Sequence, residues 1–265
     1  MVNTENEKLL SKYKMLCRNR GLTRKTIAAF ECDLSLFFRH MGNKSINEIT
    51  HHDIDDFFFY CQDSRKNSSQ AINRKFTTLN GFFKTMIKKE YITGWNPLDK
   101  LDKPKIRKRI KDYLTEEELR RILKYLEDKN DLRGQAFFHL AYSSACRVSE
   151  LNQLDRDTLD MSRREFKVIG KGEKERLCIF GEKAKEHTEK YLDSRKDDLN
   201  PLFISRERNR WSIRAMQVFV SKTAKDAGVN KRITPHSLRH SALTNLRLRG
   251  VPLEDLQLLA GHESI

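Results

Sequence analysis

The chain has 265 residues, which is enough for one large domain or for two ordinary domains that each bury a core. Its 52 lysines and arginines against 37 aspartates and glutamates give a formal net charge of +15, and a surplus of this size favours a polyanionic partner such as nucleic acid. The opening MVNTENEKLL is not a secretory pattern, and no apolar run approaches the roughly 18 residues of a membrane span, so we expect a cytoplasmic protein without a membrane partner.

The first hundred residues read as a helical unit of about four helices. Apolar side chains recur at three- and four-residue steps over Leu22–Met41 and Ala71–Ile87, and a shorter helix is predicted over Asp53–Cys61. Thr23 and Thr50 are suitable caps for two of these helices. The cluster His51, His52, Asp53 and Asp56 does not have the spacing of metal ligands, so we interpret it as a solvated helix start.

The helical pattern ends near Gly94, and the stretch KPKIRKRIK at residues 103–111 has six basic side chains among nine residues. We predict an interdomain linker here, a solvated tether that would also neutralise phosphates if it lay on a polyanion. Its basic residues are Lys103, Lys105, Arg107, Lys108, Arg109 and Lys111. Residues 1–111 together hold 23 basic and 12 acidic side chains, so the positive charge is concentrated towards the front of the chain.

The second part of the chain is predicted to combine helices with a β-hairpin. Thr115 and Glu118 form a capping box for a helix that runs through Asp128. EFKVIGKGEKERLCIF, residues 165–180, has short apolar runs on either side of a glycine-rich turn and is typical of a hairpin. Further helices are predicted over Leu132–Ser143, Glu182–Lys196, Ile213–Ala227, Pro235–Arg249 and Leu253–Ala260. The fold class is therefore mainly α with a small β-hairpin or sheet (α+β), in two domains.

The five cysteines are odd in number, widely spread and never in a C-x-x-C pair, which predicts reduced thiols and argues against a zinc site. They are Cys17, Cys32, Cys61, Cys146 and Cys178. No motif for a bound nucleotide such as G-x-x-x-x-G-K-[ST] occurs in the chain. We therefore expect neither a metal nor another cofactor.

Two motifs in the second part carry basic side chains in special positions. ACRVSELNQL, residues 145–154, places Arg147 and Glu150 one turn apart at a helix start, which by itself could be a local ion pair worth a few tenths of a kcal/mol. The hairpin turn GKGEKER presents Lys171 between two glycines, where a backbone can approach a ligand closely. Each motif alone is weak evidence for function.

Two further motifs follow near the end. In TPHSLRHS, Thr234 is a good N-cap and Pro235 a good first helical residue, which leaves His236 and Arg239 on one face of a helix start that favours anions. LLAGHES then ends a helix at a glycine and places His262 just beyond it.

Taken in order, these motifs resemble those of the tyrosine recombinases, the phage-type integrases and Xer-like resolvases. The resemblance implies a SAM-like helical core-binding domain at residues 1–102, the linker at 103–111 and a catalytic domain at 112–265, with the two domains closing around duplex DNA. It implies metal-free, ATP-independent phosphoryl transfer through a 3′-phosphotyrosyl intermediate. Hosts of such enzymes are bacteria or archaea, or mobile elements and viruses within them.

The resemblance also assigns roles to individual residues. Arg147 and Arg239 would hold the non-bridging oxygens of the scissile phosphate, and Glu150 would support the site by fixing the first arginine. Lys171 would protonate the departing 5′ oxygen. Pre-placed guanidinium groups suit this reaction because negative charge gathers on the equatorial oxygens in the transition state.

His236 and His262 would complete the pocket. The nucleophilic tyrosine of such enzymes lies on the helix after the second histidine, whereas the last tyrosine of this chain is Tyr191. A truncation of a longer protein is the preferred explanation, with a natural fragment or a tyrosine supplied by a partner as alternatives. On this expectation the 265 residues bind DNA but do not cleave it.

Further DNA contacts are expected from Arg74 and Arg214 as well as from the linker. The partner would be a double-stranded recombination site, with a free monomer and a tetrameric synapse on DNA for the full-length protein. Two alternatives stay open: a non-catalytic DNA-binding or regulatory module of the same fold, and a type IB topoisomerase that shares the phosphate pocket.

Overall fold

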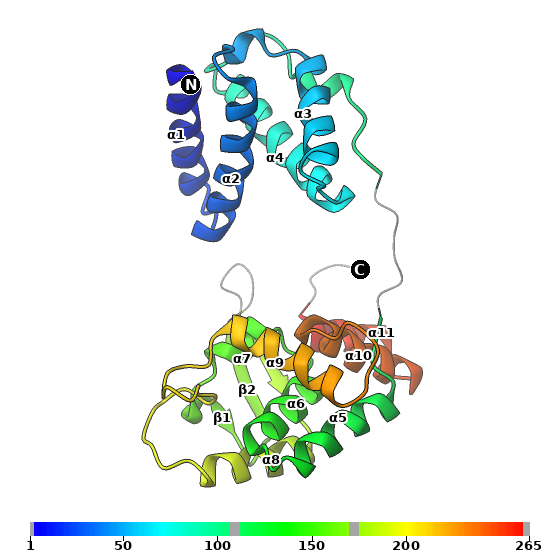
Figure 1. The fold of residues 1–265 in the computed structure, drawn as a ribbon. Coiled ribbons are helices and arrows are strands. Elements are labelled where there is room, and N and C mark those ends of the chain that lie inside the picture. The colour runs from blue at the N-terminus through cyan, green and yellow to red at the C-terminus, as the bar shows by residue number, and fades with distance from the viewer. Residues whose placement is uncertain (1–2, 106–111, 170–174, 262–265) are drawn as a thin grey trace. The chain divides into compact units, whose positions relative to one another are not determined.

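The computed structural model describes residues 3–105, 112–169 and 175–261 (Figure 1). The chain forms two compact units, Met1–Arg109 and Ile110–Ile265, and each has its own hydrophobic core. Helices dominate both units, and the second unit also contains a small antiparallel sheet. The predicted α+β class is therefore confirmed.

Within residues 3–105, the first unit contains four α-helices and two short 3-10 turns, as the sequence predicts for the helices. The elements are α1 (Thr4–Asn19), α2 (Arg24–Met41), η1 (Ile46–Glu48), α3 (His51–Asp63), α4 (Ser69–Lys88) and η2 (Pro97–Lys100). Phe37, Phe57 and Phe83 are fully buried, and the rings of Phe37 and Phe57 meet edge to face at 5.2 Å. Such aromatic pairs supply much of the buried apolar area in a unit of this size.

Capping side chains determine where these helices begin. The Thr23 side chain accepts a hydrogen bond from the backbone N–H of Thr26, as its position predicts. Thr50 and Asp53 form a capping box, so α3 begins at His51, two residues before the predicted start. Ser68 likewise caps α4 two residues before the predicted start. The sequence thus located these helices, and their N-caps fixed the residues at which they begin.

A buried charge cluster joins α2 to α4 in the first unit. Asp33 is completely buried, and its Oδ1 accepts hydrogen bonds from Lys75 Nζ and Arg74 Nη2, each at 2.8 Å. Lys75 is itself only 5 % exposed. The Thr78 hydroxyl donates to the second carboxylate oxygen at 3.3 Å. Arg74, a predicted DNA contact, is therefore partly engaged inside the unit.

The described part of the second unit contains seven α-helices, one 3-10 turn and three strands. The helices are α5 (Glu116–Asp128), α6 (Leu132–Ser144), α7 (Val148–Gln153), α8 (Glu182–Asp193), α9 (Ile213–Asp226), α10 (Pro235–Leu248) and α11 (Leu253–Ala260), and the turn is η3 (Arg156–Thr158). The strands are β1 (Leu159–Asp160), β2 (Glu165–Ile169) and β3 (Glu175–Ile179). The Thr115 capping box of α5 and the bounds of α11 agree with the prediction.

The sheet is antiparallel with the order β1-β2-β3. Phe166 and Cys178 are partners in register and face the core, whereas Leu177 and Ile179 on the other face of β3 are exposed. The two strands of the predicted hairpin are confirmed. The two-residue strand β1 was not predicted, because it is too short to show alternation.

Helix α6 passes through the centre of the second unit and packs against α5, α8 and α10 (Figure 1). Phe137 and Phe138 are both fully buried within it. Between α6 and α8 the rings of His139 and His187 stack at 4.2 Å. Burial lowers the pKa of His139 to about 4, and the neighbouring His187 adds to this effect. The two imidazoles are therefore packed as neutral rings.

The predicted end of α8 at Lys196 was wrong, because the helix ends at Asp193. Two residues later, Arg195 folds back on the following loop and donates from Nη1 to the carbonyls of Pro201 at 2.7 Å and Leu202 at 3.1 Å. These bonds favour a turn over further helix.

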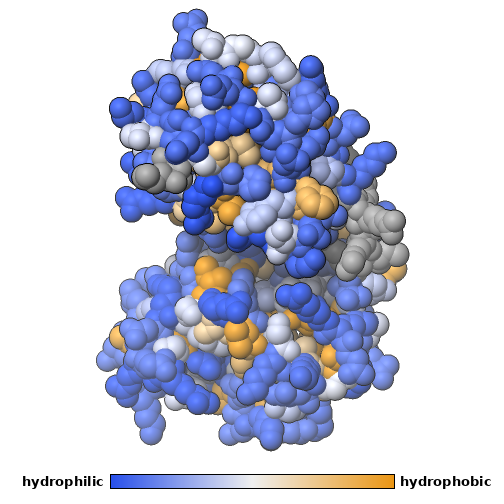
Figure 2. All heavy atoms as spheres, turned by 45° about the horizontal axis from the view of Figure 1, so that its top comes forward, coloured by the Kyte–Doolittle hydropathy of each residue, from blue (hydrophilic) through white to orange (hydrophobic). Residues whose placement is uncertain are grey.

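Figure 2 shows that polar residues cover most of the visible surface, with scattered apolar side chains.

Candidate active site

The turn between α6 and α7 positions the first candidate residue. Ala145 takes a left-handed conformation with φ 49° and ends α6, and Arg147 then caps α7. Glu150 Oε1 accepts a bond from Arg147 Nη1 at 2.8 Å, and Oε2 accepts one from the Arg147 backbone N–H at 2.7 Å. The predicted pair is therefore present, but Glu150 is only 4 % exposed, unlike an ordinary surface ion pair.

A third charged residue, Arg176 on β3, also binds Glu150 and was not predicted. Its Nη2 lies 2.7 Å from Glu150 Oε2. Burial alone would raise the pKa of the Glu150 carboxyl, but the hydrogen bonds from Arg147 and the charge of Arg176 together hold that pKa below its ordinary value. Glu150 is thus an ionised carboxylate between two guanidinium groups.

Arg239 on α10, far along the chain from Arg147, also lies at the turn between α6 and α7. Its side chain is buried, and Nη1 donates to the carbonyl of Ala145 at 2.7 Å. Nη2 donates to the carbonyl of Ala260 at the end of α11. Burial, and then repulsion by the nearby charge of Arg147, lower the pKa of Arg239 from its ordinary value. Arg147, Glu150 and Arg239 therefore converge, as the motif order predicts.

His236 lies in the first turn of α10, after the Thr234 cap and Pro235, as predicted. It shares the lining of a groove of about 760 Å³ with Val148, the residue that follows Arg147. The same groove is lined by α9, whose side chains add positive charge. The groove's basic residues are Arg214, Lys222, Lys225 and Arg232. His236 therefore lines the same groove as the basic residues of α9 and the residue that follows Arg147.

The remaining predicted site residues, Lys171 and His262, lie outside the described residues. Their flanking elements are present: β2 ends at Ile169 and β3 begins at Glu175. Gly261 ends α11 in the left-handed conformation with φ 60° and ψ 46°, which confirms the predicted stop. Linker residues Arg107, Lys108, Arg109 and Lys111 also lie outside the described part, whereas Lys103 and Lys105 are within it.

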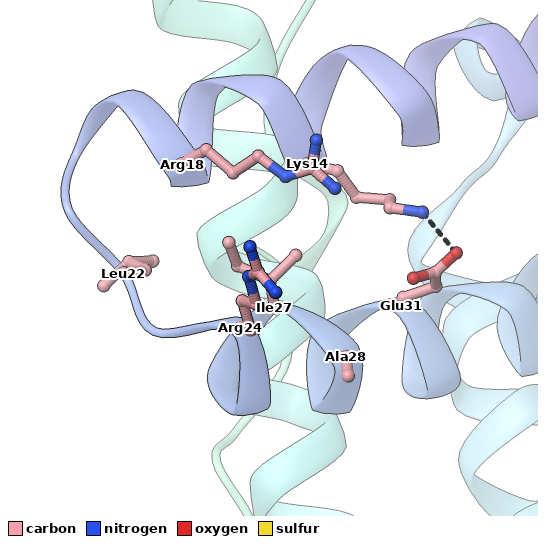
Figure 3. A pocket seen from close by; sticks show the side chains of 7 residues that line it. All are labelled: Lys14, Arg18, Leu22, Arg24, Ile27, Ala28 and Glu31. Carbon is pink, nitrogen blue, oxygen red and sulfur yellow. Dashed lines mark hydrogen bonds and ion pairs between the residues drawn. The ribbon is translucent and has the colours of Figure 1, made fainter.

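A separate hollow of about 450 Å³ lies between α1 and α2 in the first unit (Figure 3). Lys14 and Arg18 from α1 and Arg24 from α2 line it, and Glu31 Oε1 pairs with Lys14 Nζ at 2.5 Å. Its lining includes none of the predicted site residues. The hollow is therefore distinct from the candidate active site.

Within the described residues, no group of three histidine, cysteine or acidic side chains could hold a metal ion. In the same part of the chain, no helix combines the length and apolar character that crossing a membrane requires. The cluster at His51 and His52 consists of two adjacent rings 4.0 Å apart at the start of α3.

Comparison with known proteins decides the family. Residues 112–265 match the model of the phage integrase family, and residues 10–90 match that of the phage integrase N-terminal SAM-like domain. The chain belongs to the phage integrase family. The predicted resemblance to the tyrosine recombinases is confirmed.

Curated relatives of this integrase-family chain are tyrosine recombinases. It is 34 % identical to the tyrosine recombinase XerC of Thermodesulfovibrio yellowstonii, over 93 % of this chain and 84 % of the relative. It is 30 % identical to the tyrosine recombinase XerD of Oceanobacillus iheyensis, over 93 % of this chain and 86 % of the relative.

Solved structures show the same fold. A Tn1549 transposon integrase in complex with transposon right end DNA gives a TM-score of 0.84 at 20 % identity, over 100 % of this chain and 92 % of that chain. A lambda integrase tetramer bound to a Holliday junction gives a TM-score of 0.81 at 19 % identity, over 98 % of this chain and 79 % of that chain.

Proposed function

We propose that the cluster around Arg147 binds the DNA phosphate at which this site-specific recombinase breaks and rejoins a strand. Arg147 and Arg239 are the proposed ligands of the non-bridging oxygens. The observation that carries the proposal is their convergence: Arg239 binds the carbonyl of Ala145, two residues before Arg147, although 92 positions separate the two arginines. Arg147 keeps 39 % of its side-chain surface exposed and can meet a ligand.

The chemistry follows from this charge distribution. A phosphodiester gains negative charge on its equatorial oxygens as the transition state forms, and fixed guanidinium groups stabilise that state more than the ground state. In this proposal Lys171 protonates the 5′ oxygen that leaves, and His236 and His262 complete the pocket. When a side-chain oxygen replaces the sugar oxygen on phosphorus, the ester is conserved and the strand can be rejoined without ATP.

Tyr191 is unsuited to be that nucleophile. It is 5 % exposed, stacks on Phe203 and accepts a hydrogen bond from the backbone N–H of Ile204. Burial raises the pKa of its phenol, which disfavours the phenolate needed for attack. Tyr191 is therefore a core residue, and the proposed mechanism assigns it no step.

The basic groove along α9 is the proposed contact with the DNA backbone near the active site. Arg214, Lys222 and Lys225 recur along α9 at a spacing that places them on one side of the helix. Lys103 and Lys105, together with the rest of the 103–111 segment, would add contacts as a linker between a DNA-binding domain at 1–102 and a catalytic domain at 112–265. The Arg74 side chain is 51 % exposed, but its charge is partly compensated by Asp33.

The proposed partner is a double-stranded recombination site. The structure of the lambda integrase tetramer on a Holliday junction supports a tetrameric assembly on DNA, and we propose that the protein is monomeric before it binds. Xer recombinases from bacteria are among its relatives, which supports a role in the bacterial cytoplasm.

Replacement of Arg147 tests the proposal. The product of the complete reading frame would first select its binding site from random duplex DNA, and strand cleavage would then be measured on that site. Arg147→Lys keeps the charge but loses the two-pronged donor geometry, so we expect cleavage to fall about 10²–10³-fold with DNA affinity nearly unchanged. Arg163→Lys, at a side chain that is 75 % exposed, is the matched control and should keep full activity.

Equal cleavage by wild type and Arg147→Lys would refute the assignment of Arg147. Relaxation of supercoiled plasmids that is indifferent to the selected site would favour a type IB topoisomerase instead. Site-specific DNA binding without cleavage by the wild-type reading-frame product would favour a non-catalytic module.

A further inference from the structure

We infer that Arg176 is a positioning residue, which through Glu150 and the end of α11 fixes the arginine cluster that binds the scissile phosphate. This inference rests on the proposed function and extends it to a residue that no sequence motif singled out. Arg176 is not proposed to touch the substrate. It acts through the Glu150 side chain and the Leu259 carbonyl, to which it donates hydrogen bonds.

The first contact acts on Glu150. Each carboxylate oxygen has a defined donor: Oε1 accepts from Arg147 Nη1, while Oε2 accepts from both the Arg147 backbone N–H and Arg176 Nη2. The carboxylate is thus held on both sides and cannot rotate without breaking a charged hydrogen bond. Because Glu150 in turn orients the Arg147 guanidinium, Arg176 determines where that guanidinium points.

The second contact acts on α11. Arg176 Nη1 donates to the carbonyl of Leu259 at 2.9 Å, in the last turn, where helix carbonyls lack partners of their own. A Cβ added to Gly261 would lie 2.6 Å from Arg176 Cδ, so the arginine stem occupies the space beside the helix stop. Gly261 directly precedes His262 in the chain. The position of Arg176 therefore constrains the backbone that leads to the second pocket histidine.

The surroundings of Arg176 keep its side chain in one place. Its side chain is 13 % exposed, and Nη1 also lies 2.9 Å from Cys178 Sγ. Cys178 Sγ in turn lies 3.3 Å from Cys146 Sγ, and both thiols are buried. The Arg176 guanidinium contacts both sulfur atoms and so connects β3, which carries Cys178, to the turn that carries Cys146. The arginine is thus held by the fold instead of moving freely in solvent.

A balance of charge also depends on Arg176. Burial pushes the pKa of the Glu150 carboxyl upward, and the charge of Arg176 is one of the contributions that hold it low. Loss of Arg176 should therefore raise the pH at which Glu150 becomes protonated. Protonated Glu150 would accept weaker hydrogen bonds from Arg147. The cleavage rate should therefore begin to fall at a higher pH in a variant without Arg176 than in wild type.

The test uses the product of the complete reading frame and the DNA site that the wild type selects. Arg176→Met is expected to lower the cleavage rate about 10–100-fold, as loss of a positioning contact typically does, while the Kd for DNA changes less than about threefold. The acid limb of its pH–rate profile should move to higher pH. Arg164→Met, a surface arginine just before β2 that pairs with Glu182, is the control and should leave rate and profile unchanged.

Two further variants separate positioning from mere support of the fold. Arg176→Lys retains the charge but offers one ammonium in place of a fork, so we expect about a tenfold lower rate with the acid limb unmoved. If Arg176→Met does not fold, the rate of Arg176→Lys decides alone. In a Glu150→Gln background, Arg176→Met should cause no further shift of the acid limb, because the group that titrates is gone.

An acid limb of Arg176→Met that matches wild type would overturn the inference, as would full activity of Arg176→Lys. The proposed function fails separately. If Arg147→Lys cleaves DNA as fast as wild type, the proposed phosphate site is refuted whatever the Arg176 variants do. If Arg147→Lys cleaves more slowly but both Arg176 variants behave as wild type, only the positioning role is refuted.

Discussion

Removal of the Asp33 carboxylate should destabilise the first unit far more than removal of an exposed carboxylate. Asp33 is fully buried, and Lys75, its partner at 2.8 Å, is 5 % exposed. In Asp33→Ala the Lys75 ammonium is left without its counter-charge, because the Lys75 side chain is only 7 % exposed. Breaking a buried pair in this way costs about 3–5 kcal/mol. We expect a loss of this size in the free energy of unfolding.

Urea unfolding can measure this change in the first unit alone. The protein contains two tryptophans, Trp95 and Trp211, so a Trp211→Phe background leaves Trp95 as the reporter of the first unit. Asp63→Ala, which removes an exposed partner of Lys66 in the same unit, is the matched control and should change the free energy of unfolding by less than about 1 kcal/mol.

The double variant Asp33→Leu/Lys75→Met provides the decisive comparison. It removes both charges together, so most of the lost stability should return. The reasoning is refuted if Asp33→Ala unfolds within about 1 kcal/mol of the parent, or if the double variant is as unstable as the single one.

Three other outcomes are expected. The pKa of His139 is lowered to about 4 in the folded chain, whereas it is about 6.5 in the unfolded chain. The unfolded chain therefore binds the proton more tightly, so the free energy of unfolding is highest above pH 6.5 and falls as the pH falls towards 4. Thermal unfolding between pH 7 and 4 should show this loss in wild type and less of it in His139→Gln. Gly134→Ala places a Cβ within 2.8 Å of Leu126 and Phe219, so urea titration should show a loss of about 1–3 kcal/mol despite the higher helix propensity of alanine. Lys222→Gln should reduce the slope of log K for duplex DNA against log salt by about 0.9, and an unchanged slope would remove this residue from the DNA surface.

The helices could be predicted from sequence because their causes are local. The apolar period placed α2 and α4, and the capping pair Thr115 and Glu118 placed the start of α5 to the residue. Errors occurred where contacts distant in sequence override local preference. Helix α8 stops at Asp193 because Arg195 turns back to a loop that the helical pattern does not reveal.

The same distinction applies to the site. Arg147 and Glu150 are three residues apart, and a helix start brings them together from local geometry alone. Arg176 meets Glu150 across 26 residues and Leu259 across 83, so no short motif contains the contact. The signal that could have found it is the strand alternation of β3, which points Arg176 to the same face as the buried Cys178.

The way in which Arg239 is held has a consequence for the order of events when the protein is made. One guanidinium joins the carbonyl of Ala145 to that of Ala260, so the pocket needs a segment that leaves the ribosome 115 residues after the turn it completes. A nascent chain that has only reached α10 lacks the Ala260 carbonyl to which Arg239 Nη2 donates. On the proposed function, the phosphate site is therefore completed late in synthesis, when the end of α11 has been made.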